Sequence, residues 1–266
     1  ILVNHEHGLG VWKGRTLCLL DGLTQCLADR VITVSKASRQ LRISRERISP
    51  RRILTMYNAI DWMYWSRVTP AGQRSGLSLG VAASLTRVKR IDLALRVLAG
   101  LRVARPDARL LVAGEGPELA HLKMLARELG IAPYVAFLGF VQDMAGFYAK
   151  VDAVLLTSLR EDCPMALLEA VAAGRFVVGP AAGGVPEVLQ PPVEGAVIDD
   201  RDDLSDVIQR LRDLPAGFDS RVNRDYARRF DIAEYARGIV SLYEELAERR
   251  PATVIETRCV YRMDES

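Results

Sequence analysis

The chain has 266 residues, of which 49% are hydrophobic and 26% charged, as is ordinary for a globular protein. Its formal net charge of +3 is too small to indicate nucleic-acid binding, and no apolar run reaches the roughly 18 residues of a membrane-spanning helix. Four cysteines without CxxC spacing indicate neither a zinc site nor a disulfide framework, and the first residues lack a signal-peptide pattern, so we expect a cytoplasmic location.

The first 60 residues predict one helix and two short strands. Leucines recur at helical spacing over 14–30, and apolar runs at 31–35 and 53–58 are strand-sized. Basic residues accumulate between 29 and 52, either as a solvated helix face and loop or as a surface for anionic lipid head groups or a phosphorylated acceptor. The basic residues are Arg30, Lys36, Arg39, Arg42, Arg45, Arg47, Arg51 and Arg52.

Turn formers dominate residues 61–76, which we interpret as an interdomain linker. From residue 77 onward, strand-like and helical patterns alternate. Near-continuous apolar strands separated by helices are typical of a parallel sheet that is buried on both faces. We therefore predict an α/β fold with a doubly wound, Rossmann-like domain over 77–215. Its strands are expected at 78–83, 109–113, 134–138, 153–157, 175–179 and 195–199, and its helices at 91–103, 117–129, 143–150, 165–173 and 202–213.

The last part of the chain predicts helices over 216–250, with apolar residues at helical steps from 217 to 249, and then a tail over 251–266 without a clear period. An acidic run at 199–202 follows the sixth strand and is interpreted as a helix start, not as a metal-binding motif.

In an open parallel sheet, ligands bind beyond the carboxyl ends of the strands. The loops that follow the predicted strands carry most of the glycines and charges, and the fourth loop, 158–169, is the most informative. Glu161 lies in this loop, and Pro164 opens a helix that carries Glu169. The first amides of that helix would receive hydroxyl or phosphate oxygens. The alternative is that both acids are solvated or ion-paired without a role in binding.

Glu161 and Glu169 match the E-x7-E motif of glycosyltransferase family 4, and the stretch REDCPMALLEAVAAGRFVVGPAAGGVPEVL resembles the signature segment of that family. Other stretches resemble the family in the same order, and the similarity runs from about residue 3 to about residue 245. These stretches are ADRVITVS, ILTMYNAID, SLGVAASLTRVKRID, LLVAGEGPE and VAFLGFV. The resemblance implies the GT-B fold of the glycosyl transferases group 1, with a nucleotide-sugar-binding second domain over 77–215.

The resemblance also implies roles for single residues. Glu169 would accept hydrogen bonds from the ribose of a nucleotide-sugar donor, and Glu161 would face the transferred sugar. Lys89 would neutralise the leaving diphosphate, unless it is only a surface lysine. Further donor contacts are expected from Cys163, Pro164, Met165 and Ala166 to the sugar and diphosphate, from Phe140 and Val141 to the base, and from Arg87, Gly114 and Gly116 in the neighbouring loops.

The family carries a histidine after a strand of its first domain, near the donor sugar and the acceptor. His7, followed by Gly8, fits this motif best and His5 fits it second. The alternative is two exposed histidines at the start of the chain.

The sequence departs from the family pattern at several positions. Ser84 stands where an arginine is usual, Arg90 and Asp162 each replace a usual glycine, and Ala59 replaces the glycine of the YNG motif. The Gly-rich loop of the family's first domain has no counterpart, so we expect residues 1–60 to be the last portion of that domain.

The expected activity is the transfer of a sugar from a nucleoside diphosphate to a glycan or lipid-linked acceptor, with retention of configuration and without a metal or further cofactor. Peripheral contact with the inner face of an anionic membrane is part of this expectation. The alternative is a truncated or degenerate module that binds nucleotide sugars without transferring them. A nicotinamide-dependent oxidoreductase is disfavoured, because the first strand is not followed by a G-x-G-x-x-G turn.

Overall fold

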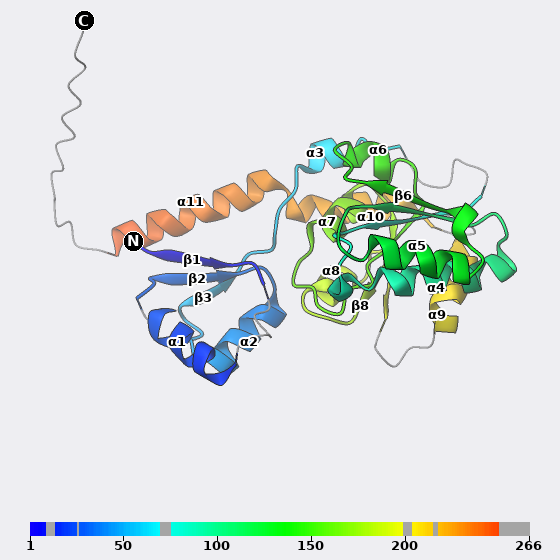
Figure 1. Cartoon of the computed structure of the whole chain (residues 1–266). Coiled ribbons are helices and arrows are strands. Elements are labelled where there is room, and N and C mark those ends of the chain that lie inside the picture. The colour runs from blue at the N-terminus through cyan, green and yellow to red at the C-terminus, as the bar shows by residue number, and fades with distance from the viewer. Residues whose placement is uncertain (9–13, 26, 70–75, 199–203, 215–217, 250–266) are drawn as a thin grey trace, which may run out of the picture.

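The computed structural model describes residues 1–8, 14–25, 27–69, 76–198, 204–214 and 218–249. In this part of the chain the strands form two sheets, one with the order β1-β2-β3 and one with the order β6-β5-β4-β7-β8-β9. The two sheets lie side by side, and a long helix near the carboxyl end, α11, runs back to the smaller one (Figure 1).

The smaller sheet is parallel and consists of β1 (Val3–Glu6), β2 (Arg30–Thr33) and β3 (Ile53–Thr55). Helices α1 (Arg15–Gln25) and α2 (Lys36–Glu46) lie on one face and α11 (Ile232–Glu248) on the other (Figure 1). Neighbouring residues of β2 point to opposite faces, as the period of a strand requires. Val31 packs in the cluster under α2, whereas Ile32 packs against Leu242 and Leu246 of α11.

The larger sheet is also parallel throughout. Its strand order reverses between β4 and β7, which is the doubly wound pattern that places a ligand site at the carboxyl ends of the strands. The strands are β4 (Ser78–Ala82), β5 (Arg109–Ala113), β6 (Val135–Gly139), β7 (Ala153–Leu155), β8 (Phe176–Pro180) and β9 (Gly195–Ile198).

Two hydrophobic clusters, one on each face, bury the larger sheet. One cluster includes side chains of α4 (Ile91–Ala104), α5 (Leu119–Glu128) and α9 (Leu204–Arg212). The other includes side chains of α6 (Met144–Tyr148), α7 (Met165–Ala172), α8 (Val185–Val188) and α10 (Ser220–Ala227). The predicted α/β fold with a parallel, doubly wound sheet is therefore confirmed.

Some predicted elements differ from the structure. The predicted linker contains a short helix, α3 (Trp62–Trp65), which begins because the Asp61 side chain accepts a hydrogen bond from the Tyr64 amide. The helical pattern over 217–249 is divided, because Asp231 has an extended conformation and caps α11. Residues 70–75 of the predicted linker, the acidic run at 199–202 and the predicted tail lie outside the described residues.

The basic run at 29–52 is not simply a solvated face. Arg42 is buried in α2, Arg39 donates hydrogen bonds to two backbone carbonyls, and Arg30 pairs with Glu245 of α11.

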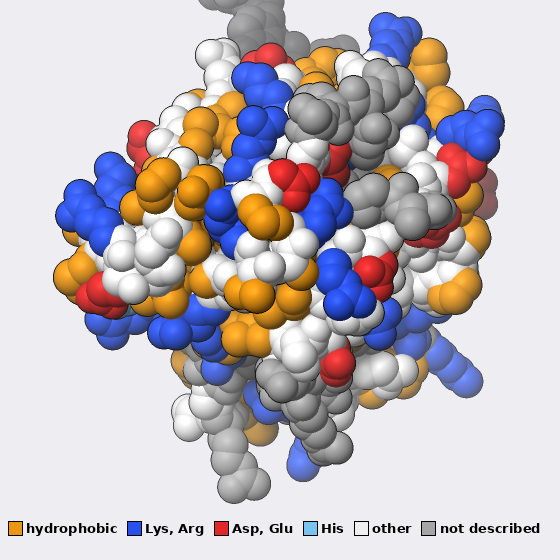
Figure 2. Space-filling model, turned by 90° about the vertical axis from the view of Figure 1, so that its right-hand side faces the viewer, with side chains coloured by type: hydrophobic (Ala, Val, Ile, Leu, Met, Phe, Trp, Pro, Cys, Tyr) orange, Lys and Arg blue, Asp and Glu red, His pale blue; other side chains and the backbone are white. Residues whose placement is uncertain are grey.

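On the side of the molecule that faces away from the smaller sheet, basic and apolar side chains are interspersed (Figure 2). No helix within the described residues is long and apolar enough to cross a bilayer.

Candidate active site at the carboxyl edge of the larger sheet

A cavity of about 330 Å³ opens where the loops after β4 and β7 meet the start of α7. Five residues that the sequence singles out line it together: Lys89, Glu161, Pro164, Met165 and Ala166. The carboxyl ends of parallel strands share one edge of a sheet, so residues 72 positions apart in the chain come into contact here.

Lys89 and Glu161 form an ion pair in this cavity. The Lys89 ammonium lies 2.6 Å from a Glu161 carboxylate oxygen, and the two side chains are 27% and 11% exposed. The loop after β7 also holds the backbone of the lysine, because the Thr157 hydroxyl donates a hydrogen bond of 2.7 Å to the Lys89 carbonyl. The pair places a positive and a negative charge against the same hollow, where an incoming polar ligand can compete for either partner.

The start of α7 supplies backbone donors to the cavity. Pro164 is the N-cap with φ −68° and ψ 137°, and the first intrahelical hydrogen bond runs from the Leu167 amide to the Pro164 carbonyl. The Met165 and Ala166 amides precede this bond and have no acceptor within the helix. Amides at a helix start carry partial positive charge, so this end of α7 suits anionic oxygen atoms.

Glu169 lies one turn further along α7 and does not line the cavity. The Tyr148 hydroxyl donates to a Glu169 carboxylate oxygen at 3.1 Å and also contacts the Ala166 carbonyl at 3.2 Å. Burial raises the pKa of Glu169, and the hydrogen bond from Tyr148 offsets part of that rise. The pKa of Tyr148 is raised as well, chiefly by burial and then by the Glu169 charge.

Two glycines allow tight packing of the loop after β7, residues 158–164, which we call the carboxylate loop because it carries Glu161 and Asp162. Gly183 has φ +57°, and a Cβ atom added there would lie 1.7 Å from the Glu161 carbonyl oxygen. The Gly184 amide donates to the Asp162 carbonyl at 2.6 Å. The pair of glycines after β8 therefore fixes the backbone of the loop that carries Glu161.

The β5 loop contains the predicted residues Gly114 and Gly116. The Gly114 amide donates to the Gly139 carbonyl at 2.8 Å, and a Cβ atom on Gly114 would lie 1.9 Å from the Ala83 carbonyl oxygen. The Phe140 amide donates to the Glu115 carboxylate at 3.2 Å, while the Phe140 side chain is 78% exposed. These contacts bring the ends of β4, β5 and β6 together.

Other predicted residues lie beside the cavity or apart from it. Val141 packs partly against the core, and Cys163 is buried with a thiol pKa that burial raises to about 12. Arg87 has an almost fully exposed side chain that pairs with Glu118 at 3.4 Å and lines a separate hollow of about 440 Å³. The structure does not bring Arg87 to Glu161.

His7 follows β1, is exposed, and does not line the cavity. Its ring stacks on that of His5 with the centroids 6.1 Å apart. His5 lies 3.4 Å from the hydroxyl of Tyr235 in α11, and burial lowers its pKa, with a smaller contribution from His7. A catalytic role for His7 stays a prediction.

Sequence reasoning missed a set of contacts that segments following β2 and β3 make with the loop of Glu161 and with α8. The side-chain amide of Asn58 donates to the Cys163 backbone carbonyl at 2.7 Å, and the Ser35 hydroxyl donates to the Asp162 carboxylate. Glu187 accepts from the Tyr57 hydroxyl at 2.6 Å. Asn58 and Glu187 belong to the segments YNAID and GGVPE, so the available signal was their place in these motifs.

Comparisons with known proteins point to one family. A family model described as glycosyl transferases group 1 matches residues 76–214. The N-acetyl-alpha-D-glucosaminyl L-malate synthase of Bacillus anthracis is 31% identical over 215 residues, which cover 76% of this chain and 55% of that protein. The D-inositol 3-phosphate glycosyltransferase of Corynebacterium kroppenstedtii is 29% identical over 248 residues, which cover 84% of this chain and 55% of that protein. The chain thus spans about half the length of these curated relatives.

Solved structures agree in fold. The crystal structure of Anabaena HepE in complex with UDP has a TM-score of 0.82 at 22% identity and covers 92% of this chain and 72% of that one. Sucrose-phosphate synthase from Thermosynechococcus elongatus has a TM-score of 0.79 at 20% identity and covers 93% of this chain and 68% of that one. At these identities the likeness shows the fold alone.

Proposed function

The chain belongs to the glycosyl transferases group 1, and from that premise we propose that it carries the donor site of a retaining glycosyltransferase. The observation that supports this most directly is the ion pair of Lys89 and Glu161 beside the start of α7, within one cavity at the carboxyl edge of the sheet. A cation, a carboxylate and unpaired amides in one hollow suit a ligand with both phosphates and sugar hydroxyls.

In the proposed reaction a nucleoside diphosphate sugar occupies this cavity. The Lys89 ammonium and the Met165 and Ala166 amides stabilise the negative charge that grows on the diphosphate as its bond to the anomeric carbon breaks. An acceptor hydroxyl attacks the anomeric carbon from the same face, and its proton passes to the departing diphosphate. Glu161 binds the hydroxyls of the transferred sugar and stabilises positive charge at the anomeric carbon.

The rest of the donor extends toward β6. Glu169, oriented by the Tyr148 hydroxyl, accepts hydrogen bonds from the ribose. The backbone of Phe140 and Val141 contacts the base. The structure of Anabaena HepE with UDP-glucose supports a uridine nucleotide as the first probe for this chain. We propose a glycan or lipid-linked acceptor, and a phosphatidylinositol N-acetylglucosaminyltransferase subunit of Arabidopsis thaliana, 26% identical over 83% of this chain and 52% of that protein, supports the lipid-linked case.

The first test is the release of UDP from UDP-glucose, with water or a panel of glycans and glycolipids as acceptor. We expect Glu161→Gln to lower the rate on the order of 100-fold or more, because it removes a charge that acts mainly in the transition state. Glu128→Gln, on the exposed end of α5, is the matched control and should leave the rate unchanged. Equal rates for wild type and Glu161→Gln would contradict the proposal.

The second candidate is a module that binds nucleotide sugars without transferring them, favoured by Ser84, which lines the cavity where the family has an arginine. Calorimetry with UDP, GDP and their sugars, combined with the turnover assay, distinguishes the two functions. Binding of a nucleotide sugar, together with no turnover of any donor tested, would favour the module. Proton NMR can identify the anomer that forms first. A first product with the same anomeric configuration as the donor would favour a retaining transferase.

A further inference from the structure

Helix α2 contacts residues from both halves of the proposed site. It starts at Lys36, beside the carboxylate loop of the larger sheet, and two turns later Arg42 lies beneath the end of β1. Glu161 and His7, the two candidate catalytic side chains, lie in the two segments that this helix contacts. Within the described residues, neither side chain forms a hydrogen bond or ion pair with α2; Glu161 pairs with Lys89 instead.

The amino end of α2 receives two carboxylates from the larger sheet. Its N-cap, Ser35, donates a hydrogen bond to Asp162, the residue that follows Glu161. Glu187 accepts from the amides of Lys36 and Ala37 at 2.9 and 2.8 Å. Carboxylates at a helix start satisfy amides that lack intrahelical acceptors and interact favourably with the helix dipole. The bond from Ser35 ties the Glu161 loop to α2, and the bonds to Glu187 tie α8 to the same end of α2.

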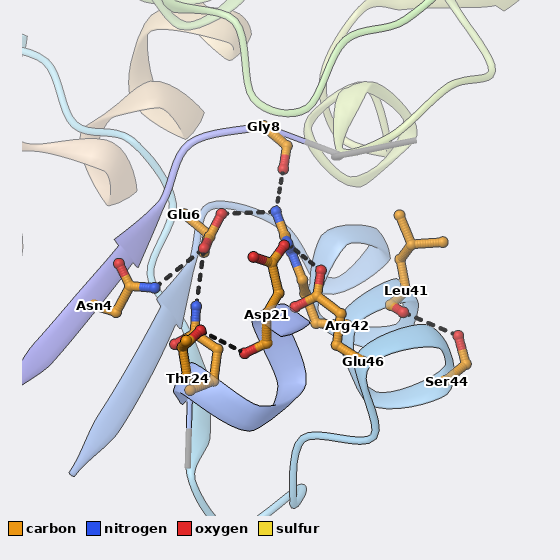
Figure 3. A network of polar contacts seen from close by, with 10 residues as sticks. Asn4, Glu6, Gly8, Asp21, Thr24, Leu41, Arg42, Ser44 and Glu46 are labelled. Atoms are coloured by element: carbon orange, nitrogen blue, oxygen red, sulfur yellow. Dashed lines mark hydrogen bonds and ion pairs between the residues drawn. The ribbon is translucent and has the colours of Figure 1, made fainter. Parts of the chain in front are cut away.

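The middle of α2 fixes the end of β1 through a buried guanidinium. Arg42 has a side chain that is 2% exposed, and it pairs with Glu6 at 2.7 Å and with Glu46 of its own helix. It also donates to the Gly8 carbonyl at 3.0 Å, and the guanidinium lies between these partners (Figure 3). Glu6 and Gly8 stand on either side of His7, so one side chain holds both neighbours of that histidine, Glu6 through its carboxylate and Gly8 through its backbone carbonyl.

We propose that α2 is the common scaffold of the site, with Asp162 and Arg42 as positioning residues that fix Glu161 and His7 respectively. This inference rests on the proposed function for its catalytic meaning. The Ser35–Asp162 bond is buried and the Arg42–Glu6 pair is partly buried, and each involves a charged group, so a change at either link alters the contacts of a charge that has little access to water.

The test compares Asp162→Gly, Ser35→Ala and Arg42→Gln with the control Arg45→Gln, which changes an exposed arginine on the same helix. Hydrogen–deuterium exchange reports the backbone of 158–164 and of 3–8, and UDP release from UDP-glucose reports the rate. Asp162→Gly and Ser35→Ala should raise exchange at 158–164, and Arg42→Gln should raise it at 3–8. Circular dichroism checks that each variant folds.

Misplacement of a catalytic group by about 1 Å costs on the order of 100-fold in rate. We therefore expect all three variants to lower kcat for UDP release by roughly 10- to 100-fold. The Kd for UDP should stay within about twofold, because UDP lacks the sugar that Glu161 contacts and the changed residues do not line the donor cavity.

Exchange that is unchanged over both segments, or variants that keep the kcat of the wild type, would overturn the inference. A rise of KM alone would also overturn it, because that result indicates a binding role and not a positioning one. If the wild type neither binds nor turns over UDP-glucose, the proposed function fails on this probe, while the exchange data still decide whether α2 fixes the two segments.

Discussion

The three acidic residues around the start of α7 differ in their surroundings. Glu161 has a cation at 2.6 Å, whereas Glu169 and Asp162 are bonded to hydroxyl groups. Burial is the largest cause of the raised pKa at both Glu169 and Asp162. Spacing could predict that Glu161 and Glu169 belong to one segment, but it could not predict which acid would be ion-paired, because the partners are 72 and 21 residues away.

The raised carboxyl pKa values predict a pH dependence of stability. A carboxyl with a raised pKa binds its proton at a higher pH in the folded state than in the unfolded chain, so stability is lost as the pH rises. The loss begins at the ordinary pKa values of 3.8 for Asp162 and 4.5 for Glu169. We expect Glu169→Gln to weaken this fall in the free energy of unfolding as the pH rises above about 4.5, measured by urea titration at a series of pH values. A slope equal to that of the wild type would contradict the burial of this carboxylate.

The secondary structure elements follow from apolar patterning wherever the pattern is long. All six described strands of the larger sheet overlap predicted runs, with ends that differ by at most two residues, because strands buried on both faces are apolar almost without interruption. The short helix α3 was not predicted, since its four residues are too few to show a period. The tight contact of the loops after β7 and β8 also has no periodic signature and depends on the backbone of Gly183.

A substitution at this contact tests how the loop of Glu161 is held. We predict that Gly183→Ala destabilises the protein by more than Gly130→Ala. Both replace a glycine with φ near +60°, which costs roughly 1–2 kcal/mol, but an added Cβ meets no atom within 4 Å at Gly130 and overlaps the Glu161 carbonyl at Gly183.

Chemical denaturation gives the two free energies of unfolding, and UDP release from UDP-glucose gives the effect on the loop. Gly183→Ala should reduce the rate and Gly130→Ala should not. Equal destabilisation by the two variants would show that the loops are not in contact at this point.

At the scale of the whole molecule, the chain returns to its beginning. Helix α11 follows the larger sheet in sequence but packs on the smaller one, where Leu242 and Leu246 contact Ile32. The contacts between the two halves join residues that are far apart in sequence, 127 positions for Ser35 and Asp162 and 151 for Lys36 and Glu187. Patterns within short windows of sequence predict elements but not such distant pairs. The two-domain division and its boundaries stay predictions.

Because α11 packs on the smaller sheet, we predict that the stability of this sheet depends on α11. Leu246→Ala should cost about 2–5 kcal/mol, because it leaves a cavity under the sheet. Val240→Ala, on the exposed side of the same helix, should change stability by less than about 1 kcal/mol. Hydrogen exchange should increase over β1 to β3 in Leu246→Ala, with the larger sheet unchanged. A uniform increase over both sheets would indicate a single cooperative unit.

The central claim is that the cavity beside α7 holds the diphosphate of a nucleotide sugar. Calorimetric titration of UDP into wild type, Lys89→Gln and the control Lys123→Gln, an exposed lysine on α5, tests it most directly. We predict that Lys89→Gln weakens UDP binding at least about tenfold, because a charge-assisted contact with phosphate contributes roughly 1.5–3 kcal/mol, while Lys123→Gln binds as the wild type does. Equal affinity of all three proteins for UDP would contradict this account.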